Sequence, residues 1–204
     1  MGMGSEFNLI VAGVGGQGIL FTSRVITRAA LMEGKNFIQS EVHGLSQRYG
    51  SIRTEIRIGD DVFSPLIVPG TLDLLMALEP IEGARCAEYV SRRTSVIINT
   101  HLIPPIGAAV AGIRVPSLEE VVDALRLMGP KSLITVPATE LAKEVGDPMV
   151  TNVVMLGAAE GIGVMPFEEG TLLRALEEVS PERYRELNVR AFEAGRRYTR
   201  ESTE

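Results

Sequence analysis

Short apolar runs alternate along the chain with stretches of a different period. In these stretches the apolar residues recur every three or four positions, which is typical of a helix with one buried face. The strand-like runs are 9–12, 37–42, 74–78, 95–99 and 133–136. Regular alternation of strands and helices favours right-handed βαβ units. The pattern therefore predicts an α/β fold, a Rossmann-like doubly wound, mainly parallel sheet with helices on both faces and a helical C-terminal segment.

End signals place the predicted helices more closely. Ser117 and Glu120 have the spacing of a capping box, and Gly34 is a typical helix stop. The predicted helices cover 19–33, 80 to about 92, a segment after 117, and 139–145. The last helix should begin at Ser180-Pro181 and bury a stripe of Tyr184, Leu187, Ala191, Ala194 and Tyr198, while its arginines (Arg183, Arg185, Arg190, Arg196, Arg197 and Arg200) form a solvated face.

Residues 52–58 have a different pattern of side chains. Isoleucine and threonine alternate there with arginine and glutamate, a period of two that predicts a strand with one face in water or against a partner. The turn residues Gly59-Asp60-Asp61 come next, followed by Val62-Phe63. This order predicts a β-hairpin.

Length and charge limit the organisation and the partners. With 204 residues we expect one domain, over residues 8–204, with residues 1–7 as a flexible tail. The formal charge of −6 argues against nucleic acid as the main partner. The stretch 97–115 is apolar but carries His101, two prolines and Arg114, so we expect no membrane span.

The counts of reactive residues exclude several kinds of catalytic centre. One cysteine, Cys86, cannot hold an iron–sulfur cluster, and two histidines, His43 and His101, are too few for a histidine-rich metal site. We therefore predict no metal site on this chain. Cys86 falls in an apolar helical pattern and should be packed rather than reactive. Such scarcity of cysteine fits a cytoplasmic location.

A glycine-rich loop follows the first strand. Gly13, Gly15 and Gly18 match the spacing G-x-G-x-x-G, which lets a backbone approach a phosphate at a helix N-terminus. Glu41 could then hold the ribose of a dinucleotide. The candidate binding residues are Gly13, Gly15, Gly16, Gln17 and Gly18. A tight turn that binds nothing is an equally good interpretation of the glycines alone.

A polar loop follows the second strand and carries the other candidates. His43 could donate or accept a proton near neutral pH, and Arg48 could clamp a carboxylate or phosphate. Ser46 and Gln47 could orient a bound group. Because the loop follows a strand, we expect it at the same carboxyl edge of the sheet as the glycine-rich loop. The alternative is that these side chains only tie down the loop or form a polar interface.

These motifs together resemble a known family. The order Val14-Gly15-Gly16-Gln17-Gly18, then Glu41-Val42-His43-Gly44-Leu45-Ser46-Gln47-Arg48, then Gly50-Ser51, is similar to the gamma-type subunits of the 2-oxoacid:ferredoxin oxidoreductases. The second motif is closest to the beta subunits of the indolepyruvate:ferredoxin oxidoreductases. Ser64-Pro65-Leu66-Ile67, Glu79-Pro80 and 99–105 also fit, whereas Tyr49 stands where a small residue is expected.

The resemblance implies a reaction and a division of labour. An aryl 2-oxoacid such as indolepyruvate would be decarboxylated on thiamine diphosphate. Coenzyme A would capture the product as an acyl thioester, and the electrons would pass through iron–sulfur clusters to ferredoxin. Thiamine diphosphate and the clusters would lie on a larger alpha subunit. This chain would complete the active-site cleft, with coenzyme A at the interface and His43 and Arg48 facing the partner or the substrate carboxylate.

Three hypotheses therefore remain at the level of the sequence. The first is a non-autonomous enzyme subunit, inactive alone and able to form a homodimer when isolated. The second is a stand-alone oxidoreductase that binds NAD or a flavin through the glycine-rich loop. The third is a non-catalytic interaction module with an empty glycine turn.

Overall fold

The sheet is the framework of the molecule. The structure, a computed structural model, describes residues 6–44, 50–105, 107–108 and 112–202. Within these ranges one sheet has the strand order β2-β3-β1-β4-β5-β6. Its strands are β1 (Phe7–Val14), β2 (Phe37–His43), β3 (Ser51–Ile58), β4 (Leu74–Ala77), β5 (Ser95–Asn99) and β6 (Ser132–Val136).

The pairing is mixed but mostly parallel. β1, β4, β5 and β6 run parallel to one another. β3 is antiparallel to both of its neighbours, β1 and β2, and separates them. The predicted α/β class and the mainly parallel sheet are confirmed. Local sequence patterns did not reveal that β3 is inserted between the first two strands.

The predicted hairpin after residue 58 is wrong. Residues 59–73 form a loop rather than a return strand. Both edges of β3 are already paired, with β1 and β2, so no edge remains for a hairpin partner. The loop instead folds back along β3: the Ile67 N–H donates to the Glu55 carboxylate (2.9 Å), and Arg57 donates to the Ser64 carbonyl oxygen (2.6 Å).

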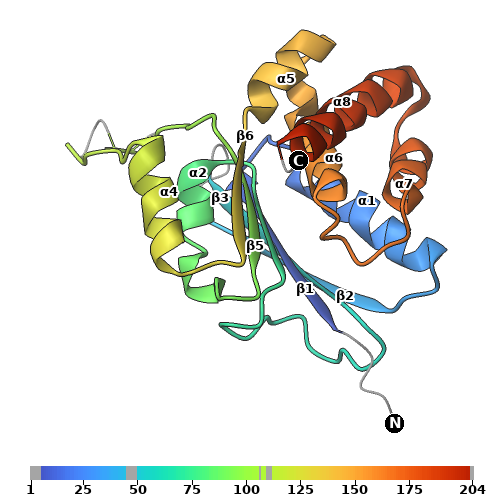
Figure 1. The fold of residues 1–204 in the computed structure, drawn as a ribbon, viewed down its shortest axis with the longest axis horizontal. Coiled ribbons are helices and arrows are strands. Elements are labelled where there is room, and N and C mark those ends of the chain that lie inside the picture. Colours follow the sequence, from blue (N-terminus) through green and yellow to red (C-terminus); the bar gives the residue numbers. More distant parts are fainter. Residues whose placement is uncertain (1–5, 45–49, 106, 109–111, 203–204) are drawn as a thin grey trace.

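Helices cover both faces of the sheet, as predicted (Figure 1). One face packs against a large apolar core to which five of the described helices contribute, and the other against a smaller core. The first group is α1 (Ile19–Met32), α6 (Thr151–Gly161), α7 (Thr171–Val179) and α8 (Glu182–Glu201), with α5 (Ala138–Val145) beyond the edge; α2 (Pro80–Ala84) and α4 (Leu118–Leu127) cover the second face. Short 3-10 turns lie at Ala87–Tyr89 (η1) and Pro148–Val150 (η2).

Two helix boundaries test the end signals. Ser117 and Glu120 form the predicted capping box at the start of α4. The helix predicted from Pro80 to about residue 92 ends at Ala84 instead. After α2 the chain forms 3-10 turns, because the N–H groups of Cys86 and Tyr89 donate to carbonyl oxygens only three residues back. These turns bring Cys86 into the smaller core.

The buried face of α8 differs from the predicted stripe. Ala191 and Ala194 are buried, but Tyr184 is 42% exposed and the centre of the contact is Phe192 and Gly195. α6 and α8 approach so closely that a Cβ on Gly195 would lie 1.9 Å from the Val154 carbonyl oxygen. Backbone contact, which a hydrophobic pattern does not encode, therefore sets the rotation of α8.

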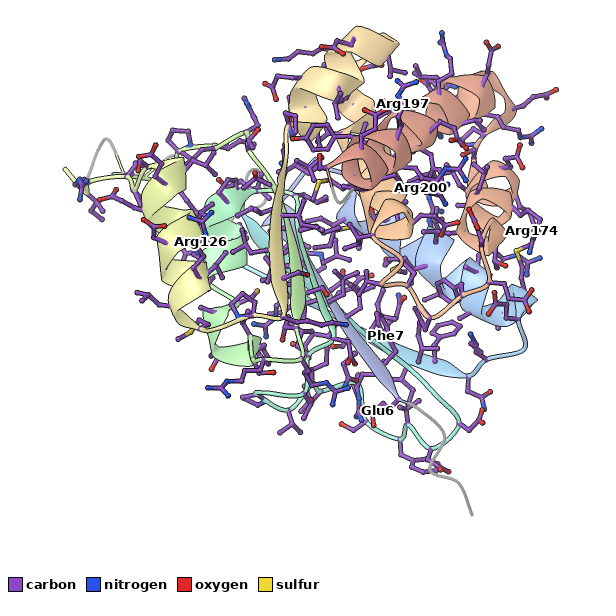
Figure 2. All side chains as sticks on the ribbon, in the orientation of Figure 1. Glu6, Phe7, Arg126, Arg174, Arg197 and Arg200 are labelled. Carbon is purple, nitrogen blue, oxygen red and sulfur yellow. The ribbon has the colours of Figure 1, made fainter. Side chains whose placement is uncertain are left out.

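The arginines of the C-terminal segment lie mostly at the surface. Figure 2 shows Arg197 and Arg200 on α8 and Arg174 on α7, on the opposite side of the sheet from Arg126 on α4. Arg196 pairs with Glu193 at 2.7 Å. The predicted solvated face is confirmed. No helix in the described part of the chain is long and apolar enough to cross a membrane.

Candidate functional site

The glycine-rich loop connects the end of β1 to the start of α1 at the carboxyl edge of the sheet. Gly16 (φ +100°) and Gly18 (φ +75°) adopt left-handed backbone conformations that favour glycine. A Cβ on Gly18 would lie 2.6 Å from the Asn152 side chain, whereas a Cβ on Gly16 would meet nothing within 4 Å. Gly18 is therefore required for packing, and Gly16 presents open backbone that a ligand could approach.

Gln17 fixes the shape of this loop from within. Its Oε1 accepts a hydrogen bond from the Val14 N–H (2.8 Å), and its Nε2 donates to the Leu78 carbonyl oxygen (3.0 Å). A Cβ on Gly13 would lie 2.6 Å from this same Oε1, which explains the glycine there. Both polar ends of the amide are thus engaged by the protein, so Gln17 acts here as a clamp on the loop.

Asn152, at the start of α6, ties the other side of the loop down. Its Nδ2 donates to the Gly18 carbonyl oxygen (3.2 Å) and to Thr22 Oγ1 (3.3 Å) in α1. The side chain is buried. The first turn of α1 and the start of α6 are consequently held as one unit beside the glycines.

The two sequence motifs meet at this edge, as predicted. The Gly15 N–H donates to the Gly50 carbonyl oxygen (3.0 Å), and the Gly44 N–H donates to that of Ser51 (2.7 Å). His43 ends β2 and is exposed. Ser46, Gln47 and Arg48 lie outside the described residues, so their predicted roles stay predictions.

Two hollows flank the glycine-rich loop, and Gly16 and Gly18 border both. One has a volume of about 300 Å³ and carries two aromatic side chains, Phe21 and Tyr184, together with the amides of Asn152 and Asn188. The other, also about 300 Å³, is mostly apolar and reaches Leu20 and Ile52. An elongated ligand with both polar and apolar parts would find surfaces for each on the two sides of one loop.

Sequence reasoning missed a buried polar junction beneath the loop. The Leu78 carbonyl oxygen accepts from Gln17 and also from Asn99 Nδ2 (3.0 Å). Next to it, the fully buried Glu79 carboxylate accepts from the N–H groups of Ile103 (3.0 Å) and Glu82 (2.9 Å). Burial raises the pKa of Glu79 above its ordinary value, although these N–H donors oppose the rise.

This junction had a signal in the sequence. Both Glu79 and Asn99 are polar residues placed directly at the end of an apolar strand run, where side chains of parallel strands converge. His101 lies two residues further on and is exposed. The junction links the glycine-rich loop to the segment after β5, so both are held by the two residues that follow β4, Leu78 and Glu79.

Glu41 is poorly placed for the ribose of a dinucleotide. It lies on β2 opposite Thr54 of β3, and β3 stands between β2 and β1. With strands roughly 4.8 Å apart, β2 runs about 10 Å from β1, twice the spacing of adjacent strands. In a dinucleotide site the acidic residue stands on the strand next to the glycine-rich loop.

The structure shows where Cys86 lies and how the described His, Cys, Asp and Glu side chains are distributed. Cys86 is buried, and burial raises the pKa of its thiol to about 11, although the nearby Arg53 opposes that rise. The prediction that it is packed rather than reactive is confirmed. Among the residues that the structure describes, no cluster of three or more His, Cys, Asp or Glu side chains could hold a metal ion.

Comparison with known sequences gives matches along nearly the whole chain. Residues 8–198 match the family model of the pyruvate ferredoxin/flavodoxin oxidoreductases. The chain is 40% identical to indolepyruvate oxidoreductase subunit IorB of Archaeoglobus fulgidus over 190 residues, which cover 93% of this chain and 94% of the relative. It is 33% identical to the IorB subunit of Thermococcus kodakarensis with the same coverage. A more distant relative, 27% identical over 97% of this chain and 92% of its own, is 2-oxoglutarate synthase subunit KorC of Archaeoglobus fulgidus.

Solved structures share the fold. The gamma subunit of a keto/oxoacid ferredoxin oxidoreductase from Geobacter sulfurreducens superposes with a TM-score of 0.66 at 23% identity, over 95% of this chain and 98% of that one. A 2-oxoglutarate:ferredoxin oxidoreductase from Magnetococcus marinus, solved with 2-oxoglutarate, coenzyme A and succinyl-CoA bound, gives 0.71 at 18% identity. That match covers 97% of this chain and 31% of the longer one.

Proposed function

Because the chain belongs to the pyruvate ferredoxin/flavodoxin oxidoreductase family, we propose that it serves an enzyme that oxidises an aryl 2-oxoacid such as indolepyruvate. Like its relatives, it is a non-autonomous subunit of a 2-oxoacid:ferredoxin oxidoreductase. The observation that carries the choice of substrate is full-length similarity, at 33–40% identity, to subunits named for indolepyruvate. Relatives named for 2-oxoglutarate are only 27–28% identical.

The chemistry of the reaction needs thiamine diphosphate and iron–sulfur clusters, and this chain is not equipped to hold the clusters. Thiamine diphosphate stabilises the carbanion left by decarboxylation, and iron–sulfur clusters carry electrons to ferredoxin. A cluster requires several thiolates, and the sequence contains one cysteine, which is buried. We therefore assign the clusters to a larger alpha subunit, and the family resemblance leads us to place thiamine diphosphate there as well. The single cysteine of this chain fits a reducing cytoplasm, where we propose that the complex works.

We assign part of the coenzyme A site to the glycine-rich loop. Coenzyme A is a long molecule with anionic phosphates, an adenine base and a thiol arm. The open backbone of Gly16 lies at the N-terminus of α1, where unpaired N–H groups and the helix dipole favour an anion. The hollow with Phe21 and Tyr184 offers flat apolar surface on one side of the loop.

The remaining residues of the site have positioning roles in this proposal. Gln17 and Asn152 keep the loop in shape, and neither has to move for a ligand to approach Gly16. His43 is exposed at the same edge, where it would face the partner or the substrate carboxylate. Arg48, Ser46 and Gln47 would complete that side of the cleft.

The first experiment is co-purification from the native host with a tag on this chain. A brown partner that, together with this chain, oxidises indolepyruvate with ferredoxin and coenzyme A is the expected result, and the isolated chain should be inactive. A colourless, solitary protein, or activity of the isolated chain, would contradict the subunit proposal.

The coenzyme A contact is tested by a matched pair of variants. Asn and Asp tolerate left-handed backbone better than other side chains, so Gly16→Asn and Gly16→Asp should both fold. In the purified complex we expect the KM for coenzyme A to rise at least tenfold more in Gly16→Asp than in Gly16→Asn, since only the former brings a negative charge to the phosphates. Equal KM values in the two variants would remove coenzyme A from this loop and leave the subunit assignment intact.

A further inference from the structure

A separate, smaller cavity lies on the other face of the sheet. It has a volume of about 180 Å³ and lies between β3 and the segment around α2. Its polar lining includes Ser51 and Arg53 from β3 and Glu82 and Arg85 from α2 and the turn after it. Its apolar wall includes Ala12 and Val42. Of the residues given a role above, His43 also lines this space, whereas the glycine-rich loop does not.

Arg53 is the most unusual group in this cavity. Its Nη2 pairs with Glu55 Oε1 (2.9 Å), and its guanidinium lies 5.0 Å from the centre of the Tyr89 ring. Its Nε is buried and has no hydrogen-bond partner. A buried donor left without an acceptor costs about 1–3 kcal/mol, so such groups are rare and a bound acceptor is one way to satisfy them.

Hydrogen-bond donors also exceed acceptors in the rest of the cavity. Glu82 accepts from Ser51 Oγ (2.5 Å) with one carboxylate oxygen and from Arg85 Nε (3.2 Å) with the other. Each guanidinium is a planar fork of several N–H donors and accepts nothing. Glu82 is the only carboxylate among the described lining residues, which also include two arginines and His43; Glu55, outside the lining, pairs with Arg53. The cavity is therefore suited to an added acceptor with negative charge.

We propose that this cavity binds a small organic carboxylate. A carboxylate matches the planar fork of an arginine, and charge-assisted bonds of this kind are the strong ones. The volume equals that of about six water molecules at roughly 30 Å³ each, which admits a carboxylate with a short apolar tail and excludes a nucleotide or coenzyme A. The tail would lie against Ala12 and Val42.

The cavity shares no lining residue with the hollow of Phe21 and Tyr184 proposed for coenzyme A, and Arg53 is fixed within it. The rigid support of Arg53 by Glu55 and Tyr89 means that its fork is already held in place before a ligand arrives. Glu55 is itself buried and accepts from the Ile67 N–H (2.9 Å), so the loop after β3 helps to fix this arrangement.

The test uses the isolated chain and calorimetric titration with acetate, 2-oxobutanoate and phenylacetate at constant ionic strength. We expect saturable millimolar or tighter binding of at least one of them. Arg53→Gln should weaken that binding at least tenfold, and the control Arg126→Gln, an exposed side chain on α4 that does not line the cavity, should leave it unchanged.

A second variant tests the proposal even if Arg53→Gln fails to fold. The Arg85 side chain is 60% exposed, so Arg85→Gln should keep the fold and still weaken binding severalfold. The proposal is overturned if the folded wild-type chain binds none of these probes, if both variants bind like the wild type, or if chloride competes as well as a carboxylate. Because the assay contains neither coenzyme A nor a partner subunit, its failure leaves the proposed function untouched.

Discussion

At the scale of single residues, the G-x-G-x-x-G spacing conceals three different physical requirements. Gly13 makes room for the Gln17 amide, Gly18 makes room for Asn152, and Gly16 alone faces open space. The sequence predicted all of these residues as candidate ligand contacts. It could not separate them, because the atoms that crowd Gly18 come from a residue 134 positions away.

Gln17 provides the sharpest prediction at this scale. Gln17→Met keeps the length of the side chain but removes both hydrogen bonds, leaving the Val14 N–H and the Leu78 carbonyl oxygen with one partner fewer. We expect a loss of about 1–3 kcal/mol in the free energy of unfolding, measured by urea denaturation. Gln39→Met, at an exposed position on β2, is the matched control and should change stability little. Equal effects in the two variants would show that the clamp does not stabilise the loop.

At the scale of secondary-structure elements, local patterns predicted well where the strands lie along the chain, but predicted poorly which strands pair with each other. The alternation in residues 52–58 is a true strand signal, and it is the position of β3 between β1 and β2 that made the expected hairpin impossible. Pairing is decided by contacts distant in sequence, which a period of two does not report. The shortened helix after Pro80 and the rotated face of α8 have the same origin, since tertiary packing overrides local propensity.

The close backbone contact between α6 and α8 predicts that a larger residue at one of its glycines destabilises the protein. A Cβ on Gly157 would lie 1.9 Å from the Phe192 carbonyl oxygen, and a Cβ on Gly195 would lie equally close to that of Val154. Backbone atoms cannot rotate away, so the helices would have to separate. We expect Gly157→Ala to cost more than the roughly 1–3 kcal/mol typical of overpacking, with a large fall in Tm by calorimetry.

The control for this contact is another glycine without such neighbours. A Cβ on Gly107 would meet nothing within 4 Å, so Gly107→Ala should leave Tm nearly unchanged. A Gly157→Ala variant as stable as the wild type would mean that the two helices are not held at this distance in solution.

At the scale of the whole molecule, the strand order separates this chain from a dinucleotide-binding enzyme. The glycine-rich loop stands where a pyrophosphate would be expected, but the neighbour of β1 on that side is the antiparallel β3. The position that would hold the adenosine ribose is thereby occupied by a strand running the wrong way. The same insertion brings Gly50 and Ser51 beside the glycine-rich loop, so one topological feature both disfavours NAD and joins the two motifs of the site.

This topology predicts that NAD(H), NADP(H) and flavins do not bind the isolated chain. A ligand at 100 times its Kd stabilises a protein by about 2.7 kcal/mol, and each kcal/mol raises Tm by roughly 2–4 °C for a chain of this size. A specific dinucleotide with a Kd near 10 μM would therefore raise Tm by roughly 5–10 °C at millimolar concentration. We expect no shift above the scatter of a thermal-shift assay. A clear shift that disappears in Glu41→Ala would restore the dinucleotide hypothesis, because Glu41 is the acidic residue that it requires.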